Sequence, residues 1–354
     1  MDIHVNRSDL GAVKLVDSAP APLAEGQARL RIEAFGLSAN NITYTLMGDA
    51  MRYWDAFPAP EGWGRVPVWG FASVTESRHP DIEPGTRVFG FLPMSEELVV
   101  TPGRINERGF ADVAEHRSRL AGAYNRYQRV GPPDREADAR RMLLSPLFTT
   151  SFLADDFLAD AGWFGADTLV ISSASAKTAL GIAWCAHRRG GIRTVALTAA
   201  ANIAFVEARG VYDTVAAYGD EADLPGTRAI YVDVSGSAAV RTAVHDRYRD
   251  DLVHDMILGA THVDEIGRSA ADLPGARPTM FFAPDRITTR SREWGTDGFE
   301  ARVDADWSEF APWAGAAIAL EYANGPDAVT AAYRALFENR ADPAVGLILS
   351  MHPA

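Results

Sequence analysis

Short runs of β-branched and aromatic residues, separated by glycine and proline, fill the first hundred positions of the chain. Runs of this length and composition are typical of strands joined by turns. The pattern therefore predicts a small β-rich domain, with strands at 12–17, 28–38, 66–77, 85–93 and 97–102. The stretch 104–141 is charged, lacks alternation and contains VGPPDREADARR, so it predicts a helical or irregular segment that leads out of this domain.

From about Leu143 the pattern changes to an alternation of buried-type strands and helices. TLVISS and TVALTA are the first two strands, and AKTALGIAWCAHRRG is the helix between them. Such alternation predicts parallel strands joined by right-handed helical crossovers. A helix at 323–340 and an apolar strand at 345–352 end the chain. We expect one domain from 1–142 with 322–354 and a second from 143–321.

Composition and charge narrow the class of protein. Of 354 residues 47% are apolar and 23% charged, which is typical of a globular protein, and no apolar run of the roughly 18 residues needed to span a bilayer is present. The formal charge of −13 opposes binding to nucleic acids. The first residues lack the features of a secretory signal, so we expect a cytoplasmic protein. Cys185 is the sole cysteine, which excludes an internal disulfide and a four-cysteine zinc site.

Several segments resemble a known superfamily. GQARLRIEAFGLSANNITYTLMGD, VPVWGFASV, IEPGTRVFGF, LLSPLFTTSFLADDFL and the ending DPAVGLILSMHP resemble the medium-chain dehydrogenase/reductases, in particular their zinc-free quinone and enoyl reductase branch. SSASAKTALG, ATHVDE and FFAPDR resemble the DUF2855 family within it. The resemblance implies an α/β protein: a GroES-like β-rich domain, completed by the C-terminal strand, plus a Rossmann-like parallel sheet domain. It also implies NADPH as cofactor, no zinc, and dimerisation through the edge of the nucleotide sheet.

The loop after the first Rossmann strand contains no glycine. In a Rossmann unit this loop turns tightly and places phosphates at the start of the next helix. Here the small or donor-bearing residues Ser172, Ser173, Ser175, Lys177 and Thr178 occupy it, and they could bond phosphate oxygens. A vestigial loop and a solvated Lys177 are the alternatives. A P-loop is disfavoured because it requires glycine at the positions of Ile171 and Ala176.

The second Rossmann strand predicts the choice of dinucleotide. An acid at its tip would accept the ribose 2′-hydroxyl of NADH, but TVALTAAAN has none, so NADPH is favoured. Thr198 and Asn202 lie where a 2′-phosphate would pass, or they cap the following helix; Arg193 and Arg209 are near in sequence. The other expected cofactor contacts follow later strands or lie in an irregular stretch after Phe281: Ser235, Gly259, Thr261 and Arg286.

The resemblance also supplies candidates for catalysis. Zinc-free members transfer hydride to a conjugated C=C bond, and the resulting enolate needs hydrogen-bond donors and an acid. Tyr53 resembles the tyrosine that enoyl reductases place beside the nicotinamide, Tyr44 is the second candidate, and Asn40 matches the family's Asn turn together with Asn41. Packing and a simple turn are the alternative roles. The aromatic residues nearby would favour an apolar or aromatic substrate: Trp54, Trp63, Trp69 and Phe71.

Other chemistries have little support. His262 with Asp264 and Glu265 lacks a second histidine at metal-binding spacing, and the chain has neither a G-x-S-x-G nor an H-E-x-x-H motif. The leading hypothesis is therefore an NADPH-dependent reductase of a small α,β-unsaturated carbonyl or quinone. The alternative is a non-redox or non-catalytic member that uses the interdomain cleft to bind another ligand or partner.

Overall fold

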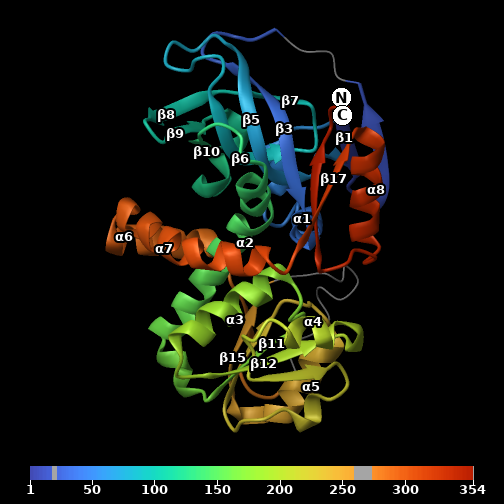
Figure 1. Ribbon diagram of the computed structural model, residues 1–354, viewed down its shortest axis with the longest axis vertical. Coiled ribbons are helices and arrows are strands. Elements are labelled where there is room, and N and C mark those ends of the chain that lie inside the picture. The colour runs from blue at the N-terminus through green and yellow to red at the C-terminus, as the bar shows by residue number, and fades with distance from the viewer. Residues whose placement is uncertain (18–21, 259–272, 354) are drawn as a thin grey trace. The chain divides into compact units, whose positions relative to one another are not determined.

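The computed structural model describes residues 1–17, 22–258 and 273–353. The chain forms two compact units: Met1–Leu143 with Ile318–Ala354 is unit 1, and Leu144–Ala317 is unit 2 (Figure 1). Unit 1 is therefore assembled from both ends of the chain, whereas unit 2 is one continuous segment.

Unit 1 is built on antiparallel strands. A three-stranded sheet has the order β2-β1-β4, and a nine-stranded sheet has the order β17-β18-β3-β5-β6-β10-β9-β8, with β7 paired to β3. The strands are β1 (Asp2–Asn6), β2 (Asp9–Val16), β3 (Ala28–Leu37), β4 (Trp63–Gly64), β5 (Pro67–Ser77), β6 (Arg87–Pro93), β7 (Glu97–Val100), β8 (Pro102–Asn106), β9 (Gly109–Asp112), β10 (Arg126–Arg129), β17 (Ala319–Asn324) and β18 (Val345–Ser350).

The expectation of a helical or irregular segment over 104–141 is wrong at 104–106, 109–112 and 126–129, where strands run through it. Strands β8, β9 and β10 extend the large sheet, and the helix starts only at Arg135. Phe110 and Tyr127 stack with ring centroids 5.3 Å apart and are buried on one face. The arginines of these strands hide the alternation in sequence, because long cationic side chains can lie along a partly exposed sheet face.

The C-terminal strand β18 completes the large sheet, as expected from the resemblance. It pairs antiparallel with β3 and parallel with β17, so the red end of the chain lies beside the blue strand β3 (Figure 1). Gly36 and Gly346 allow Leu143 to lie close to these strands, since a Cβ at Gly346 would be 2.4 Å from Leu143 Cδ1.

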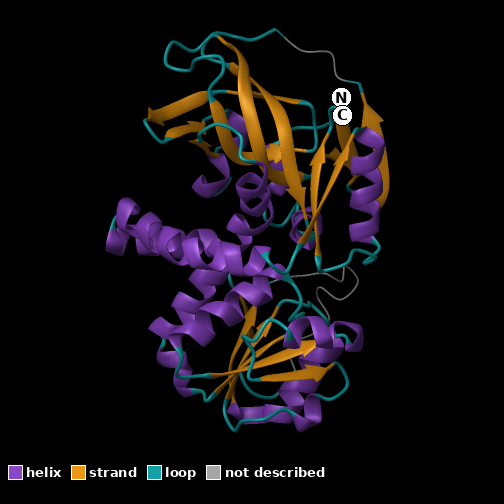
Figure 2. Cartoon of the chain, in the orientation of Figure 1, coloured by secondary structure: helices purple, strands orange, loops and turns teal. Residues whose placement is uncertain are grey.

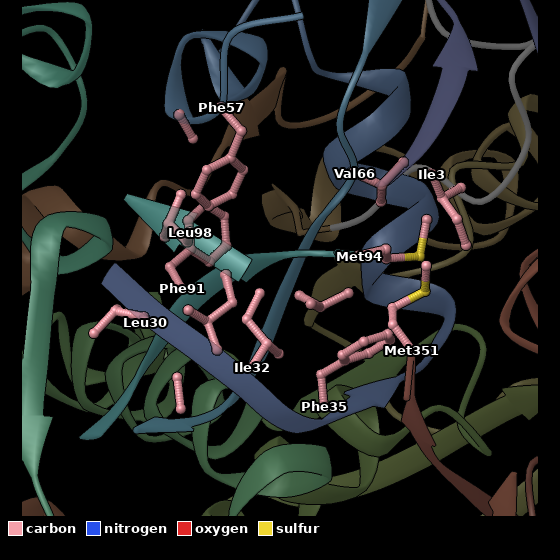
Figure 3. Close-up of a cluster of buried hydrophobic side chains, with 14 of the residues drawn as sticks. Ile3, Leu30, Ile32, Phe35, Phe57, Val66, Phe91, Met94, Leu98 and Met351 are labelled. Carbon is pink, nitrogen blue, oxygen red and sulfur yellow. The ribbon is translucent and has the colours of Figure 1, made fainter. Parts of the chain in front are cut away.

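The core of unit 1 gathers side chains from distant parts of the sequence. Phe35 of β3, Met94 after β6 and Met351 after β18 approach one another (Figure 3). All three side chains are 1% exposed or less. Burying a large apolar side chain contributes about 1.5–3 kcal/mol, so the C-terminal segment stabilises unit 1 substantially. The helical elements of this unit are α1 (Ala39–Leu46), η1 (Tyr53–Ala56), η2 (Glu115–Arg117), η3 (Gly122–Asn125), α8 (Pro326–Phe337) and the start of α2 (Arg135–Asp160).

Unit 2 contains a six-stranded sheet whose pairings are all parallel. Its order is β13-β12-β11-β14-β15-β16, which is 3-2-1-4-5-6 in chain order and defines a doubly wound Rossmann-like sheet. Helices surround this sheet (Figure 2). The strands are β11 (Thr168–Ile171), β12 (Arg193–Thr198), β13 (Thr214–Ala217), β14 (Ala229–Asp233), β15 (Leu252–Ile257) and β16 (Pro278–Met280); the helical elements are η4 (Gly162–Gly165), α3 (Lys177–Arg189), η5 (Ala200–Asn202), α4 (Ile203–Glu207), η6 (Glu221–Asp223), α5 (Ala238–Tyr248) and η7 (Arg249–Asp251).

The expectation of a long irregular stretch after Phe281 is also wrong. Helices α6 (Ala283–Trp294) and α7 (Thr296–Gly315) occupy it, separated by Gly295 at φ +74°. Pro284 lies in the first turn of α6, where its missing N–H costs no helical hydrogen bond. Within the described part of the chain, no helix is both long and apolar enough to cross a lipid bilayer.

Candidate functional site

The carboxyl ends of β11 and β14 lie side by side in the centre of the unit 2 sheet. Chain order reverses between these two strands, which is the position where open parallel sheets bind ligands. The glycine-free loop follows β11 at this point and leads into α3, whose first residue is Lys177. The candidate nucleotide loop therefore lies at the switch point of the sheet.

Ser172 joins the two strand ends. It is fully buried, and its hydroxyl donates to Asp233 Oδ1 at 3.0 Å. The same oxygen accepts the backbone N–H groups of Val234 at 3.1 Å and Ser235 at 3.2 Å. Ser235 in turn donates its hydroxyl to Asp233 Oδ1 at 2.8 Å. Ser172 and Ser235, both predicted to contact the cofactor, thus meet at one carboxylate.

Ser173 occupies the conformation that glycine favours. Its φ is +48°, a region that costs a residue with a Cβ about 1–2 kcal/mol. The hydroxyl of Tyr218 accepts the Ser173 backbone N–H at 2.8 Å and lies 3.3 Å from its Oγ. Tyr212 adds a second contact by donating to the Ala174 carbonyl at 3.2 Å. Two tyrosines from the β13 region therefore hold the turn that glycines usually make.

Ser175, Asn202 and Thr198 lie around the neighbouring strand end. Asn202 Nδ2 donates to Ser175 Oγ at 3.2 Å, which brings two predicted residues together. Thr198 ends β12 with 1% exposure, and its Oγ1 has no hydrogen-bond partner. A buried unsatisfied hydroxyl costs about 1–3 kcal/mol, so Thr198 is a natural contact for a polar ligand group. Arg193 begins the same strand and lies roughly 16 Å away at its other end.

Lys177 and Thr178 open helix α3, after Ala176 as the N-cap. Both are partly exposed at the end of the helix where backbone N–H groups favour anions. Arg286 lies elsewhere, in α6 and not in a loop. Its guanidinium contacts Asp156 at 2.9 Å and Asp160 at 2.8 Å, so two carboxylates already neutralise the predicted anion contact.

The structure adds polar groups that sequence reasoning missed. Asp233 is not among the predicted site residues, yet its side chain contacts Ser172, Ser235 and Arg241. Asp255 of β15 is 2.9 Å from His245 Nε2 and is fully buried. Burial raises the pKa of Asp255, and the hydrogen bond from His245 opposes that rise. An acid inside an apolar strand, as in LVHDMI, was the available signal.

A second group of predicted residues lies in unit 1. Tyr53 and Tyr44 are buried, with ring centroids 4.7 Å apart. The Tyr53 hydroxyl lies 3.1 Å from that of Tyr124, and Tyr44 accepts the Trp69 indole N–H at 3.1 Å. Burial raises the pKa of both Tyr44 and Tyr53, so both remain protonated at neutral pH. Such phenols can donate hydrogen bonds or protons but cannot act as bases.

The asparagine turn forms the start of α1. Asn41 accepts the Ser38 backbone N–H at 2.8 Å and donates to the Pro67 carbonyl at 2.9 Å, so it is structural. The partly exposed Asn40 hydrogen-bonds Tyr44 and lowers the pKa of that tyrosine against the larger effect of burial. Asn40 and Tyr44, two of the three catalytic candidates, are therefore in contact.

Arg117 fixes the segments that carry Tyr53 and Tyr124. This arginine is fully buried, and it donates to the carbonyls of Ala56 at 3.0 Å and Tyr124 at 2.6 Å. Its Nε lies 3.6 Å from Asp112 Oδ2. Sequence reasoning did not select Arg117, because arginine is common at surfaces and nothing local in EHRSRL marks it as buried.

Some predicted residues lie outside the described ranges. Gly259 and Thr261 belong to them, as does the HxDE stretch beginning at His262. Among described residues, no cluster of three or more His, Cys, Asp or Glu side chains could hold a metal ion. A cavity of about 230 Å³ in unit 1 contains none of the predicted catalytic or cofactor-binding residues, although Phe71, one of the aromatic residues expected near the substrate, lines it. Its lining consists of Glu33, Ala34, Phe71, Arg87, Arg135, Asp138, Met142, Tyr322, Asn324, Ile348, Leu349 and Ser350.

A doubly wound parallel sheet, together with a β-rich unit closed by the C-terminal strand, defines a two-domain fold of the medium-chain dehydrogenase/reductase type. The chain belongs to the family described as "Protein of unknown function (DUF2855)", whose model matches residues 35–342. The resemblance to DUF2855 noted in the sequence is thereby confirmed, and the predicted two-domain fold is confirmed with it.

Solved structures with this fold include three complexes with NADPH. CurA from Vibrio vulnificus is 16% identical, with a TM-score of 0.62 over 97% of this chain and 94% of that chain. E. coli YhdH is 14% identical, with a TM-score of 0.56 over 99% and 100%. Mycobacterial Rv1454c is 17% identical, with a TM-score of 0.54 over 98% of both chains. No curated protein sequence matches the chain.

Proposed function

We propose that this protein is an NADPH-dependent reductase that uses no zinc and reduces a small α,β-unsaturated carbonyl or quinone. The observation that carries the proposal is the 3-2-1-4-5-6 sheet, with a tight turn and a helix start at its switch point. Related folds hold NADPH in CurA, YhdH and Rv1454c, which supports the choice of cofactor. We assign the dinucleotide to unit 2 and the substrate to unit 1.

The residues of unit 2 suit this cofactor. Lys177 and Thr178 at the start of α3 would bind phosphate oxygens, and the unpaired hydroxyl of Thr198 would bond the ribose phosphate region at the tip of β12. No acid ends β12, so no carboxylate would repel a 2′-phosphate. Bound NADPH supplies a hydride to the substrate.

The residues of unit 1 would supply the remaining chemistry. Hydride addition to the β-carbon of an enone leaves negative charge on the carbonyl oxygen. Tyr53, Tyr44 and Asn40 are the candidate donors to that oxygen, and the raised pKa of each tyrosine keeps its proton available. Aromatic side chains around them favour a flat, apolar substrate.

One observation favours the alternative of a protein that binds another ligand without redox chemistry. The donors of the loop are already engaged: Ser172 bonds Asp233, and the Ser173 N–H bonds Tyr218. A pyrophosphate that needed the Ser173 N–H would have to displace the Tyr218 hydroxyl. Under this alternative the loop is a rigid structural turn.

Calorimetric titration with NADPH and NADH separates the two functions. The reductase proposal expects saturable binding of NADPH, weaker binding of NADH, and oxidation of NADPH in the presence of an enone or quinone panel. The absence of binding at millimolar NADPH would exclude the reductase. The cytoplasmic location and the homodimer expected from the sequence stay predictions.

A further inference from the structure

A network of four ionisable side chains is buried beneath the candidate nucleotide loop. Asp233 ends β14, Arg241 and His245 lie in α5, and Asp255 lies in β15. The side chains of Asp233, His245 and Asp255 are inaccessible to solvent, and that of Arg241 is 13% exposed. Arg241 bonds Asp233 and approaches Asp255 to 3.8 Å, while His245 Nε2 lies 2.9 Å from Asp255 Oδ2.

This network consists of two carboxylates, one guanidinium and one imidazole. His245 Nδ1 lies 2.7 Å from the Pro274 carbonyl, which can only accept, so Nδ1 carries a proton. The contact with Asp255 then shares a second proton between imidazole and carboxylate. Burying such groups is expensive, and apolar side chains of similar volume often pack a helix on a sheet with equal or better stability. A contribution to stability is therefore a weak explanation for the presence of this network.

Asp233, at one end of this network, contacts the loops that would face the cofactor. Asp233 Oδ1 accepts the Ser172 hydroxyl at 3.0 Å, the Ser235 hydroxyl at 2.8 Å and the Gly236 N–H at 2.9 Å. Ser172 Oγ also accepts two backbone N–H groups of the β14 loop. One carboxylate thus ties the ends of β11 and β14 together at the switch point.

We propose that Asp233 is a positioning residue that anchors the start of the loop 172–178 through Ser172, while Tyr218 and Tyr212 hold its turn in place of the missing glycines. Arg241 holds the Asp233 carboxylate, and Asp255 and His245 lie behind Arg241. The geometry that glycines normally permit through backbone freedom is here imposed by side-chain hydrogen bonds. The inference rests on the proposed function in so far as the loop binds NADPH. The shape of the loop itself does not depend on that function.

The test compares Asp233→Asn with Asp155→Asn in the full-length chain. Asp155 is a buried carboxylate of the same unit that pairs with Arg189 at the far end of α3. Asp233→Asn should weaken NADPH binding at least about tenfold and accelerate amide hydrogen exchange in peptides covering 172–178 and 234–237. Asp155→Asn should lower the melting temperature but leave the NADPH Kd and the exchange of these peptides unchanged.

Two further variants separate positioning from a general loss of stability. Ser173→Gly, placed in the Asp233→Asn background, should recover part of the NADPH affinity without restoring the melting temperature, because glycine adopts φ +48° without strain. If Asp233→Asn does not fold, Arg241→Lys takes its place in the test. This variant keeps the positive charge and does not touch the loop, and it should also accelerate hydrogen exchange in the loop.

The outcomes distinguish the inference from the proposed function. Wild-type protein that binds no NADPH would overturn the reductase proposal, and hydrogen exchange of the loop would still decide the positioning role. Wild-type protein that binds NADPH with an unchanged Kd and unchanged loop exchange in Asp233→Asn would overturn the role of Asp233. Equal effects of Asp233→Asn and Asp155→Asn on the NADPH Kd and on loop exchange would mean that the network has only a structural role.

Discussion

Thr198 and Thr194 are two threonines of strand β12 that can be compared directly. Both are buried, but Thr194 Oγ1 lies 3.1 Å from the Val211 carbonyl and 3.0 Å from Asp213, whereas Thr198 Oγ1 has no partner. The same substitution to valine therefore removes satisfied hydrogen bonds at one position and an unsatisfied hydroxyl at the other.

We expect Thr198→Val to leave the free energy of unfolding unchanged or raise it by up to about 1 kcal/mol, and to weaken NADPH binding about fivefold or more. Thr194→Val should lower the free energy of unfolding by about 1–2 kcal/mol without a change in NADPH affinity. Urea unfolding and calorimetric titration measure the two quantities. Equal losses of stability in both variants would mean that Thr198 has a partner in solution.

Tyr53 and Tyr333 offer a second pair of buried hydroxyls in unit 1. Tyr53→Phe should lower kcat about 100-fold or more with little change in NADPH Kd, since general acid catalysis contributes about 10²–10⁴-fold. Tyr333 donates to the Leu10 carbonyl at 2.9 Å, so Tyr333→Phe should reduce stability and spare kcat. Steady-state kinetics with an enone or quinone that the wild type reduces is the measurement. An unaffected kcat in Tyr53→Phe would leave Tyr53 as a packing residue.

At the scale of elements, α6 is held to α2 by ion pairs that depend on pH. Hydrogen bonds from Arg286 and then Arg290 lower the pKa of Asp160 below its ordinary 3.8. A lowered pKa in the folded state stabilises at pH values above 3.8, and this contribution disappears as the pH falls through the lowered pKa. The carboxylate of Asp160 is half exposed, so solvent screens these pairs.

Asp160→Asn should therefore reduce the melting temperature slightly at neutral pH, and the difference from wild type should vanish once the pH falls below the lowered pKa of Asp160. Hydrogen exchange in peptides of α6 should follow the same pH dependence. Asp246→Asn, on the exposed face of α5, is the control and should show no such difference. A difference that grows as the pH falls would contradict the sign of the pKa shift.

The elements themselves differed in how well local sequence predicted them. Buried strands such as TLVI and VGLILS, and helices with a single apolar face, followed from hydrophobic periodicity. Strands β8 to β10 did not, because pairing across the sheet overrode a charged local sequence. Helix α6 was missed because its apolar positions are sparse, and two of its arginines, Arg286 and Arg290, form ion pairs with Asp156 of α2.

At the scale of the whole molecule, the two units depend differently on chain continuity. Unit 2 is one continuous segment, whereas in unit 1 the C-terminal strand β18 pairs with β3. A chain that ends at Pro343 should lose protection from hydrogen exchange in peptides of β3, while peptides of β11 remain protected. A chain that ends at His352 retains β18 and serves as control. Equal loss of protection in β3 and β11 would show that the two units unfold together.

The candidate site was only partly accessible to sequence reasoning. The loop 172–178 was found because a Rossmann pattern demands a tight turn after its first strand. Its partners were not found, since Asp233 is 61 positions from Ser172 and Tyr218 is 45 positions from Ser173. Arg286 was predicted as an anion contact from its local setting, but it pairs with carboxylates 126 and 130 positions away.

The sequence by itself determined the α/β fold class, the alternation of strands and helices in unit 2 and the absence of glycine from the nucleotide loop. These features depend on periodicity and turn chemistry, which are local, whereas the return of the C-terminal strand was expected only from the resemblance to a known superfamily. Only the tertiary structure decided which charges are neutralised, which hydroxyl stays unpaired and what holds the loop in shape. Each of those depends on side chains brought together by folding, because hydrogen bonds and ion pairs act over a few ångströms in space and not along the chain.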